Sequence, residues 1–270
     1  MKNDKTALVK FLRTIILYTA YKRLRNHYKK LKLIWITHGT NDVFVSYLTN
    51  IRRNKKIEYK YKEERKQFLF KTQVLRLSND WFTVNIPYWL SVIDEYELKN
   101  KEVKALEIGS WEGLSSHFIL SSLPKAHLTC VDTWEGADEH KDGTSATKDV
   151  LSQIEKNFDE NLAPFKDRLS KQRGTSFSFF QANPTRCVFD FIYIDGSHHG
   201  DDVMIDAIKC FEMLKVGGIM IFDDYFWQHY KKSIDNPATA INLFLKLKKD
   251  SYKIIRMYYQ VIIVKLEDRY

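Results

Sequence analysis

Short apolar runs alternate with helical segments from residue 103 onward, and this alternation restricts the fold of the chain more than any other feature. The apolar runs Val103–Ile108, His127–Val131, Phe189–Ile194 and Ile219–Phe222 are predicted strands, and Arg168–Gln172 is a weaker candidate. Helices are predicted over 114–123, 147–162, 201–214 and 237–249, the third ended by Val216-Gly217-Gly218. Tyr252–Tyr259 and Gln260–Leu266 are predicted to pair as a hairpin. Alternation of this kind favours an α/β, Rossmann-like, mostly parallel sheet of seven strands with helices on both faces and the last strand antiparallel.

The net positive charge of the chain lies entirely in its N-terminal quarter. Residues 1–66 contain 18 Lys and Arg against 5 Asp and Glu, a net charge of +13, whereas the whole chain carries +9. Residues 67–270 therefore sum to −4. A basic arm on a mildly acidic body is the pattern expected for an anionic partner. We predict a basic helical extension over residues 1–77, followed by one domain over residues 78–270.

The extension has the periodicity of helices. Apolar side chains recur at spacings of three to four residues between 6 and 35, and a charged, helical stretch continues from 41 to 75. Three interpretations stay open. The helices form a solvated extension that packs one face on the body, or they bind an anionic membrane surface. The third, binding of nucleic acid, has the least support because no recognised motif accompanies the charge.

Neither the cysteines nor the longest apolar run near the start points to export. Cys130, Cys187 and Cys210 are odd in number and widely spaced, as expected for buried thiols in a reducing cytosol. The run Ile15–Tyr21 is too short to span a bilayer, and no signal-peptide cleavage pattern follows it. We therefore expect a cytoplasmic protein, and a membrane-binding arm would place it at the inner face of the membrane.

A turn containing two glycines follows the first predicted strand, in Glu107-Ile-Gly109-Ser-Trp-Glu-Gly113. Glycines allow the backbone to approach a ligand closely, and the N-terminus of the next helix favours polar or anionic groups. The Gly-x-x-x-Gly spacing differs from the Gly-x-Gly-x-x-Gly of dinucleotide sites, which disfavours NAD. Asp132 ends the second predicted strand, where a carboxylate accepts hydrogen bonds from ribose hydroxyls. Either feature alone is also found in an ordinary turn or cap, but together they favour a nucleoside ligand.

Three carboxylates follow two neighbouring predicted strands. Asp195 ends Phe189–Ile194, and Asp223 and Asp224 end Ile219–Phe222. Adjacent parallel strands lie about 4.8 Å apart, so these carboxylates would repel one another unless a cation joined them. Ligation by oxygen alone selects Mg, Ca or Mn over Zn. Because side chains alternate along a strand, Asp224 reaches the same ion as Asp223 only if the chain bends there. We predict a metal site formed by Asp195, Asp223 and Asp224.

His198 follows Asp195 by three residues and is a candidate general base, because imidazole has a pKa near neutrality. The alternative is that His198 satisfies backbone groups at the start of the next helix. His199 is interpreted as structural. The polar stretch 134–150 is predicted to be either a loop that closes over substrate or an ordinary surface loop.

The run from Glu107 to Asp224 resembles class I S-adenosylmethionine-dependent methyltransferases, in particular the metal-dependent O-methyltransferases of the catechol, caffeoyl-CoA and macrocin type. The resemblance extends over residues 78 to about 266 and includes Trp81–Pro87, which is similar to a segment preceding the first strand in bacterial relatives. It implies S-adenosylmethionine as cofactor, with Asp132 at the ribose and Ser176 at the adenine. The residues implied to bind the cofactor are Glu107, Gly109, Ser110, Gly113, Ser115, Asp132, Thr133, Ser176 and Asp195.

The resemblance also implies a metal and a base. Asp195, Asp223 and Asp224 match the metal triad of the family, whose third member is Asp in sugar-acting enzymes and Asn in the catechol branch. His198 matches the base of the macrolide-sugar branch and stands where the catechol branch has Lys. The implied reaction is methyl transfer to a hydroxyl, preferably of a sugar or glycan, with Mg²⁺. A homo-oligomer is also possible for the chain. Two rivals remain: a nucleic-acid methyltransferase that uses the basic arm, and a non-catalytic binding module.

Overall fold

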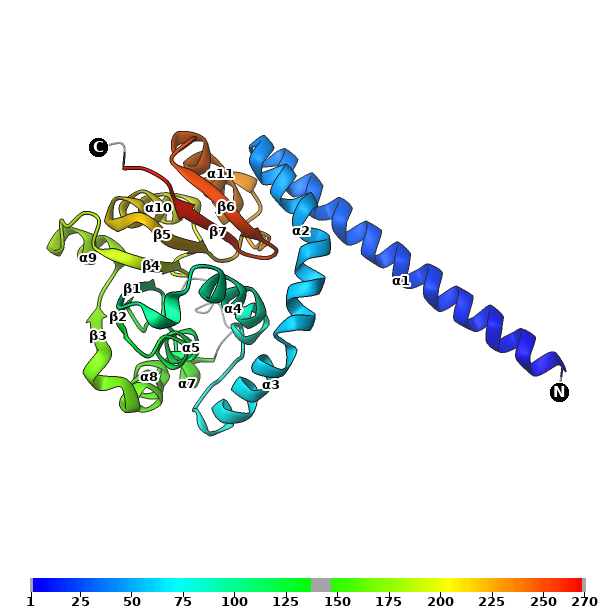
Figure 1. The fold of residues 1–270 in the computed structure, drawn as a ribbon, viewed down its shortest axis with the longest axis horizontal. Coiled ribbons are helices and arrows are strands. Elements are labelled where there is room, and N and C mark those ends of the chain that lie inside the picture. The colour runs from blue at the N-terminus through cyan, green and yellow to red at the C-terminus, as the bar shows by residue number, and fades with distance from the viewer. Residues whose placement is uncertain (1, 137–146, 269–270) are drawn as a thin grey trace.

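The computed structural model describes residues 2–136 and 147–268. A seven-stranded sheet forms its centre, in the order β3-β2-β1-β4-β5-β7-β6 (Figure 1). The strands are β1 Val103–Ile108, β2 Ala126–Asp132, β3 Leu169–Arg173, β4 Phe189–Ile194, β5 Leu214–Phe222, β6 Tyr252–Met257 and β7 Val261–Lys265. Strands β1 to β5 pair in parallel, whereas β7 runs antiparallel to β5 and to β6. The predicted Rossmann-like sheet with a C-terminal hairpin is confirmed.

Helices cover both faces of the sheet, and three more precede it. They are α1 Lys2–Ile36, α2 Asn41–Lys60, α3 Lys62–Lys71, α4 Ile86–Glu95, α5 Leu114–Ser122, α7 Lys148–Leu151, α8 Ile154–Leu162, α9 Ser176–Ala182, α10 Gly200–Met213 and α11 Pro237–Leu247. Short 3-10 turns lie at Thr72–Val74, Thr83–Asn85, Leu98–Asn100, Ala163–Arg168 and Ser233–Asp235. Helices α4 and α9 were not predicted.

One predicted boundary is wrong. The segment Val216-Gly217-Gly218 was expected to end a helix, but α10 ends at Met213 and β5 begins at Leu214, so this segment lies inside the strand. Gly217 has a φ of +79° there, and the pairing of β4 with β5 shifts register between Phe189 and Phe191. Glycines at an irregular stretch of strand mark a bulge as readily as a helix end, which is why the sequence alone misleads.

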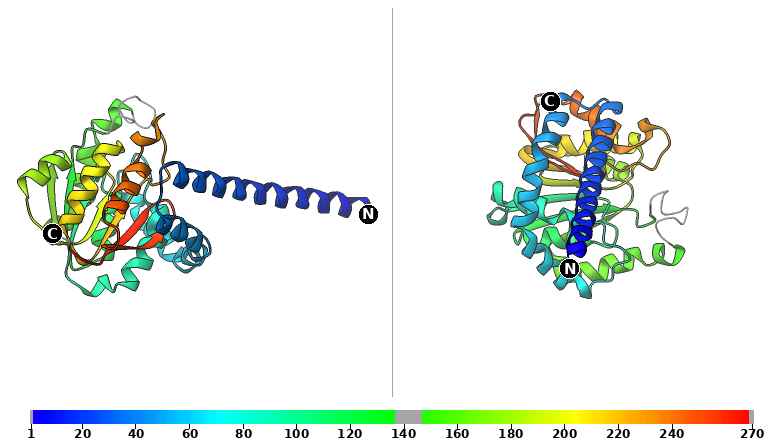
Figure 2. Two further views of the ribbon diagram at one scale, coloured as in Figure 1. Left: turned by 90° about the horizontal axis from the view of Figure 1, so that it is seen from above. Right: turned by 90° about the vertical axis from the view of Figure 1, so that its right-hand side faces the viewer.

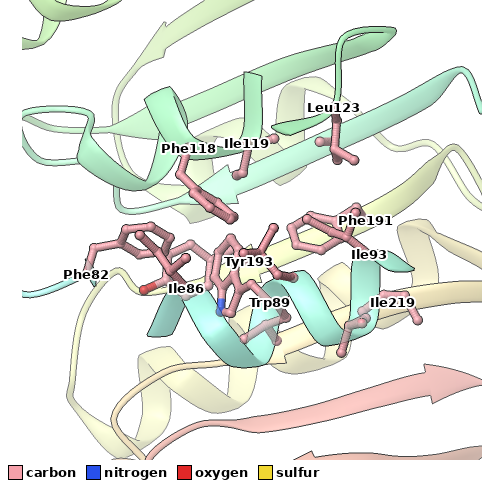
Figure 3. Close-up of a cluster of buried hydrophobic side chains, with 14 of the residues drawn as sticks. Phe82, Ile86, Trp89, Ile93, Phe118, Ile119, Leu123, Phe191, Tyr193 and Ile219 are labelled. Atoms are coloured by element: carbon pink, nitrogen blue, oxygen red, sulfur yellow. The ribbon is translucent and has the colours of Figure 1, made fainter. Parts of the chain in front are cut away.

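Successive side chains along each central strand face two different apolar layers, one on each side of the sheet. Along β4, Phe191 and Tyr193 face one layer, whereas Ile192 and Ile194 face the other. Helices α4, α5 and α8 complete the first layer, and α10 and α11 complete the second. Figure 3 shows the first layer, with Trp89 of α4 at its centre. Burial on both faces explains why the β1 and β4 boundaries were predicted to the residue: both strands consist mostly of apolar residues.

Trp89 links helix α4 to the far end of the sheet. Its ring is fully buried and lies 4.9 Å from the ring of Phe82 and 4.7 Å from that of Tyr193, measured between centroids. The indole Nε1 donates a hydrogen bond of 2.7 Å to Oε1 of Gln260, which is also fully buried. Aromatic packing and a satisfied buried donor both stabilise this contact.

We expect Trp89→Phe to lower the free energy of unfolding by about 2 kcal/mol, because it leaves a small cavity and removes the indole hydrogen bond. Urea denaturation measures the loss. The control is Phe70→Leu, a change at a ring that is 74% exposed and should cost less than about 0.5 kcal/mol. Equal stability of Trp89→Phe and the parent chain would contradict this account of the layer.

Helix α1 extends away from the body, while α2 and α3 run along its side (Figures 1 and 2). Near the end of α1, Leu33 and Ile34 are buried in the second layer, together with Val43 and Tyr47 of α2. The predicted division of the chain between residues 77 and 78 stays a prediction. Among the described residues, no helix has both the length and the hydropathy needed to cross a bilayer.

Candidate functional site

A cavity of about 1000 Å³ opens at the carboxyl ends of β1, β2, β4 and β5. Gly109, Asp132, Asp195 and Asp223, which follow or end these four strands, all line it. This is the edge at which open α/β sheets bind ligands, since the strand order reverses beside β1. The four positions on which the sequence interpretation depends therefore share one crevice.

Gly109 allows the two central strands to approach at the floor of the cavity. Its φ is +84°, and an added Cβ would lie only 1.9 Å from the carbonyl oxygen of Asp195. The backbone N–H of Asp195 donates to the carbonyl of Ile108 (2.8 Å), and that of Gly109 donates to the carbonyl of Val131 (2.9 Å). Only glycine fits this position, for reasons of both conformation and space.

Glu107 lies beneath the turn rather than in the cavity. It is fully buried, and its Oε2 accepts hydrogen bonds from the hydroxyls of Ser110 (2.8 Å) and Ser116. Burial raises the pKa of the Glu107 carboxyl, and the surrounding serine hydroxyls oppose that rise. Glu107 therefore holds the turn in shape from below. Its predicted contact with the cofactor stays a prediction.

Asp132 also organises the turn. Its Oδ2 accepts the backbone N–H groups of Ser110 (2.7 Å) and Trp111 (2.8 Å), and its Oδ1 accepts that of Trp134 (2.7 Å). A carboxylate has about four acceptor positions, so one is left for a ligand. The carboxylate thus ties the turn after β1 to the end of β2, at the place expected for a ribose.

Asp195, His198 and Asp224 converge at the cavity wall, with one ligand atom from each lying within 4.8 Å of the others. The Nε2 atom of His198 is 2.6 Å from Oδ2 of Asp224 and 3.8 Å from Oδ1 of Asp195. Asp224 reaches this cluster because its φ is +54°, a left-handed bend at the end of β5. Such a bend is the condition that the alternation of side chains imposes on Asp224.

Asp223 has different partners. Its Oδ2 accepts hydrogen bonds from Nε2 of Gln260 (2.7 Å) and from the hydroxyl of Tyr193, and its Oδ1 accepts the backbone N–H of Asp224 (2.7 Å). Gln260 also holds Trp89, so a hydrogen-bonded chain joins the core to the site. The cluster described above contains His198 rather than Asp223. The metal triad of Asp195, Asp223 and Asp224 stays a prediction.

The electrostatics of the cluster suit a cation. Burial raises the pKa of Asp195, and burial together with the charges of Asp195 and Asp224 raises the pKa of Asp223 well above its usual range. A divalent ion would offset this crowding, as Coulomb attraction favours the ionised carboxylates. The carboxylate oxygens of Asp195 and Asp224 are donors that fit such an ion, and the imidazole of His198 lies beside them.

Most of the residues predicted to bind the cofactor line the cavity, and two do not. Those that line it are Gly109, Ser110, Ser115, Asp132, Thr133, Ser176 and Asp195, whereas Glu107 and Gly113 lie outside it. Gly113 instead packs against Leu162, with a φ of +82°. His199, interpreted as structural, also lines the cavity and stacks on Tyr230 at 4.1 Å between ring centroids. Part of the predicted loop 134–150 lies outside the described residues.

Sequence reasoning missed the aromatic wall of the cavity. Trp227 lies 4.6 Å from the ring of His198, and Trp81 lies 5.4 Å from the ring of Trp111, measured between centroids; all four residues line the cavity. Trp81 belongs to the segment Trp81–Pro87 singled out above, which was the available signal. Trp227 follows Asp224 by three residues, and no motif marked it.

The N-terminal helices support the segment that carries Asp224. The hydroxyl of Tyr225 donates to Oδ1 of Asn242 (2.9 Å), whose Nδ2 donates to Oγ1 of Thr37 (2.8 Å) at the end of α1. The ammonium of Lys30 lies 4.5 Å from the centroid of the Phe226 ring, and the ring of Tyr47 packs on the same side chain. The basic extension is thus packed directly behind the site.

Comparison with known proteins agrees with this fold. Residues 106–225 match the model of a family described as a methyltransferase domain, and no curated protein matches the chain in sequence. An O-methyltransferase from Bacillus cereus in complex with SAH has a TM-score of 0.50 and 15% identity, over 76% of this chain and 90% of that chain. TomG from Streptomyces achromogenes, an O-methyltransferase in complex with SAM, also has a TM-score of 0.50, with 13% identity over 84% of this chain and 96% of that chain. The chain spans less than half the length of a Galdieria sulphuraria methyltransferase that it also matches (18% identity, 52% of this chain, 46% of that chain, TM-score 0.37).

The matched segment runs from within β1 to the residue after Asp224, so it contains the glycine turn, Asp132 and the cluster at the cavity wall. In this chain the cavity lies at the carboxyl ends of the parallel strands, beside the point where the strand order reverses. The chain therefore has the Rossmann-like fold of these O-methyltransferases, and its residues 106–225 resemble a methyltransferase domain.

Proposed function

We propose that this domain transfers the methyl group of S-adenosylmethionine to a hydroxyl oxygen, preferably of a sugar or glycan, with the help of a divalent cation, Mg²⁺ by preference. The observation that carries the proposal is the cluster of Asp195, His198 and Asp224 on the wall of the cavity formed by the glycine turn. Carboxylates and a titratable imidazole are the groups needed to bind a cation and to remove a hydroxyl proton.

The lining of the cavity favours a neutral or cationic acceptor. Eight described lining residues are Asp or Glu, and none of the described lining residues is Lys or Arg. A nucleic acid or another polyanion would bring its phosphates against this acidic wall, which counts against the nucleic-acid alternative. Flat apolar faces of Trp227 and Tyr230 beside hydrogen-bonding carboxylates suit a ring that carries hydroxyls.

In the proposed reaction the acceptor oxygen attacks the sulfonium methyl in line, the bond between sulfur and the methyl carbon breaks, and S-adenosylhomocysteine leaves. His198 takes the hydroxyl proton. A divalent cation held by Asp195 and Asp224 would lower the pKa of the acceptor hydroxyl. Nε2 of His198 contacts Oδ2 of Asp224. This contact must break before Nε2 can accept a proton from the acceptor. Asp195 and Asp224 therefore have two roles, to attract the cation and to orient the imidazole.

The test measures methyl transfer from labelled S-adenosylmethionine to a panel of neutral sugars, amino sugars, catechols and RNA, with and without Mg²⁺. Calorimetry with S-adenosylmethionine is run in parallel, since absence of binding would favour the non-catalytic module. Transfer to RNA alone would contradict the proposal in favour of the nucleic-acid alternative.

His198→Ala should lower turnover by about 10²- to 10⁴-fold, the usual contribution of a general base. The dissociation constant for S-adenosylmethionine should change little, because His198 acts on the acceptor. Single-turnover kinetics and calorimetry separate the two quantities. The control is His127→Ala, which alters an exposed side chain near the start of β2 that does not line the cavity. An unchanged rate in His198→Ala would refute its role as base.

A further inference from the structure

Helix α1 projects from the body (Figure 2), and exposed apolar side chains recur along it. Leu17, Tyr21, Leu24, Tyr28 and Trp35 follow one another at spacings of four, three, four and seven residues, so they lie along one side of the helix. Each of these five side chains is between 61% and 74% exposed. We call this set the α1 stripe.

The charge around the stripe has one sign only. Between Leu17 and Ile36 the helix holds six basic residues and no Asp or Glu. The six are Lys22, Arg23, Arg25, Lys29, Lys30 and Lys32. Long basic side chains beside an apolar stripe can keep their charged ends in the head-group region while their stems follow the apolar surface. Tyr and Trp are the aromatic residues enriched at the boundary between water and lipid.

The base of the helix fixes the orientation of the stripe. Leu33 and Ile34 are buried in the core, and Thr37 is hydrogen-bonded to Asn242 of α11. The stripe is therefore held on a rigid support and stays outside the core. It has the length of several helical turns, which suits a helix lying on a surface.

We propose that the α1 stripe binds the surface of an anionic phospholipid bilayer, with the helix lying in the head-group region. Two other occupants fit less well. A second copy of the chain packed along the stripe would bring two basic helices together with no Asp or Glu between Leu17 and Ile36 of either one. Nucleic acid would satisfy the charge, but it would leave Leu17 and Leu24 in water.

The experiment is co-sedimentation of the full chain with vesicles of phosphatidylcholine alone and of phosphatidylcholine mixed with phosphatidylglycerol. We expect binding to the mixed vesicles only, reduced by salt. Lys22→Glu/Lys29→Glu should lower the partition coefficient about 25-fold or more, from about fivefold for each cationic side chain removed. Leu24→Gln/Tyr28→Gln should also weaken binding, because the apolar stripe supplies the rest of the attraction.

The matched control is Lys166→Glu/Lys246→Glu, which makes the same change of charge at two exposed positions on the body. This variant should bind as the parent chain does. Equal loss in the control, equal binding to neutral vesicles or no vesicle binding at all would each overturn the proposal. A stable dimer dissolved by Leu24→Gln/Tyr28→Gln, or tight binding of RNA without vesicle binding, would identify the other occupants. Because the readout is binding, the result does not depend on the acceptor of the methyl group.

Discussion

Asp195→Ala is expected to lower methyl transfer by about 10³-fold or more while the protein keeps its cooperative fold. The variant removes one carboxylate of the cluster and leaves His198 and Asp224 in place. A bound metal contributes several kcal/mol of transition-state stabilisation, and each 1.36 kcal/mol is a factor of ten in rate. Steady-state kinetics measure the loss, and urea denaturation checks the fold. Relief of like-charge crowding around Asp223 should leave stability unchanged or higher.

A chelator distinguishes the contribution of the metal to activity from that of the Asp195 carboxylate. EDTA should lower the activity of the parent chain, and Mg²⁺ should restore it, whereas added Mg²⁺ should leave Asp195→Ala inactive. Asp167→Ala is the matched control, since Asp167 is exposed and does not line the cavity. Full activity of Asp195→Ala in excess chelator would remove both the metal and Asp195 from the mechanism.

The sheet was predictable because burial on two faces leaves a continuous apolar run in the sequence. Phe189–Ile194 is apolar at every position except Asp190, and its boundaries match β4 to the residue. Strand β5 was predicted too short because Val216, Gly217 and Gly218 look like the end of a helix when only local propensity is considered. The pairing with β4 overrides that propensity, and pairing is not visible in one segment alone.

The candidate site was predictable in position and less so in detail. The end of a parallel strand fixes where Asp132 or Asp195 lies, since all carboxyl ends meet at one edge. The direction of a side chain depends on backbone bends such as the positive φ of Asp224. Whether a carboxylate faces the cavity or the turn depends on its partners. Glu107 is turned inward by serines close to it in sequence, but their hydroxyls also suit a ligand, so sequence spacing does not distinguish the two roles.

Gly109→Ala should be among the most damaging single substitutions outside the charged cluster. The new Cβ would lie 1.9 Å from the carbonyl oxygen of Asp195 and 2.4 Å from its carbonyl carbon, both backbone atoms that cannot rotate away. The ends of β1 and β4 would have to separate at the cavity floor. We expect a loss of about 3–5 kcal/mol in the free energy of unfolding, the range of severe core changes. Binding of S-adenosylmethionine should weaken as well, because the turn would move.

Gly217→Ala provides the comparison that isolates the close approach from the backbone strain. Gly217 has a φ of +79°, close to the +84° of Gly109, but an added Cβ there would meet no atom within 4 Å. This variant should therefore lose only the strain of the left-handed conformation, about 1–2 kcal/mol, and should bind S-adenosylmethionine normally. Urea denaturation and calorimetry on the two variants give the difference. Equal losses would mean that the contact between Gly109 and Asp195 does not hold the two strand ends together, and the cavity floor would then need another explanation.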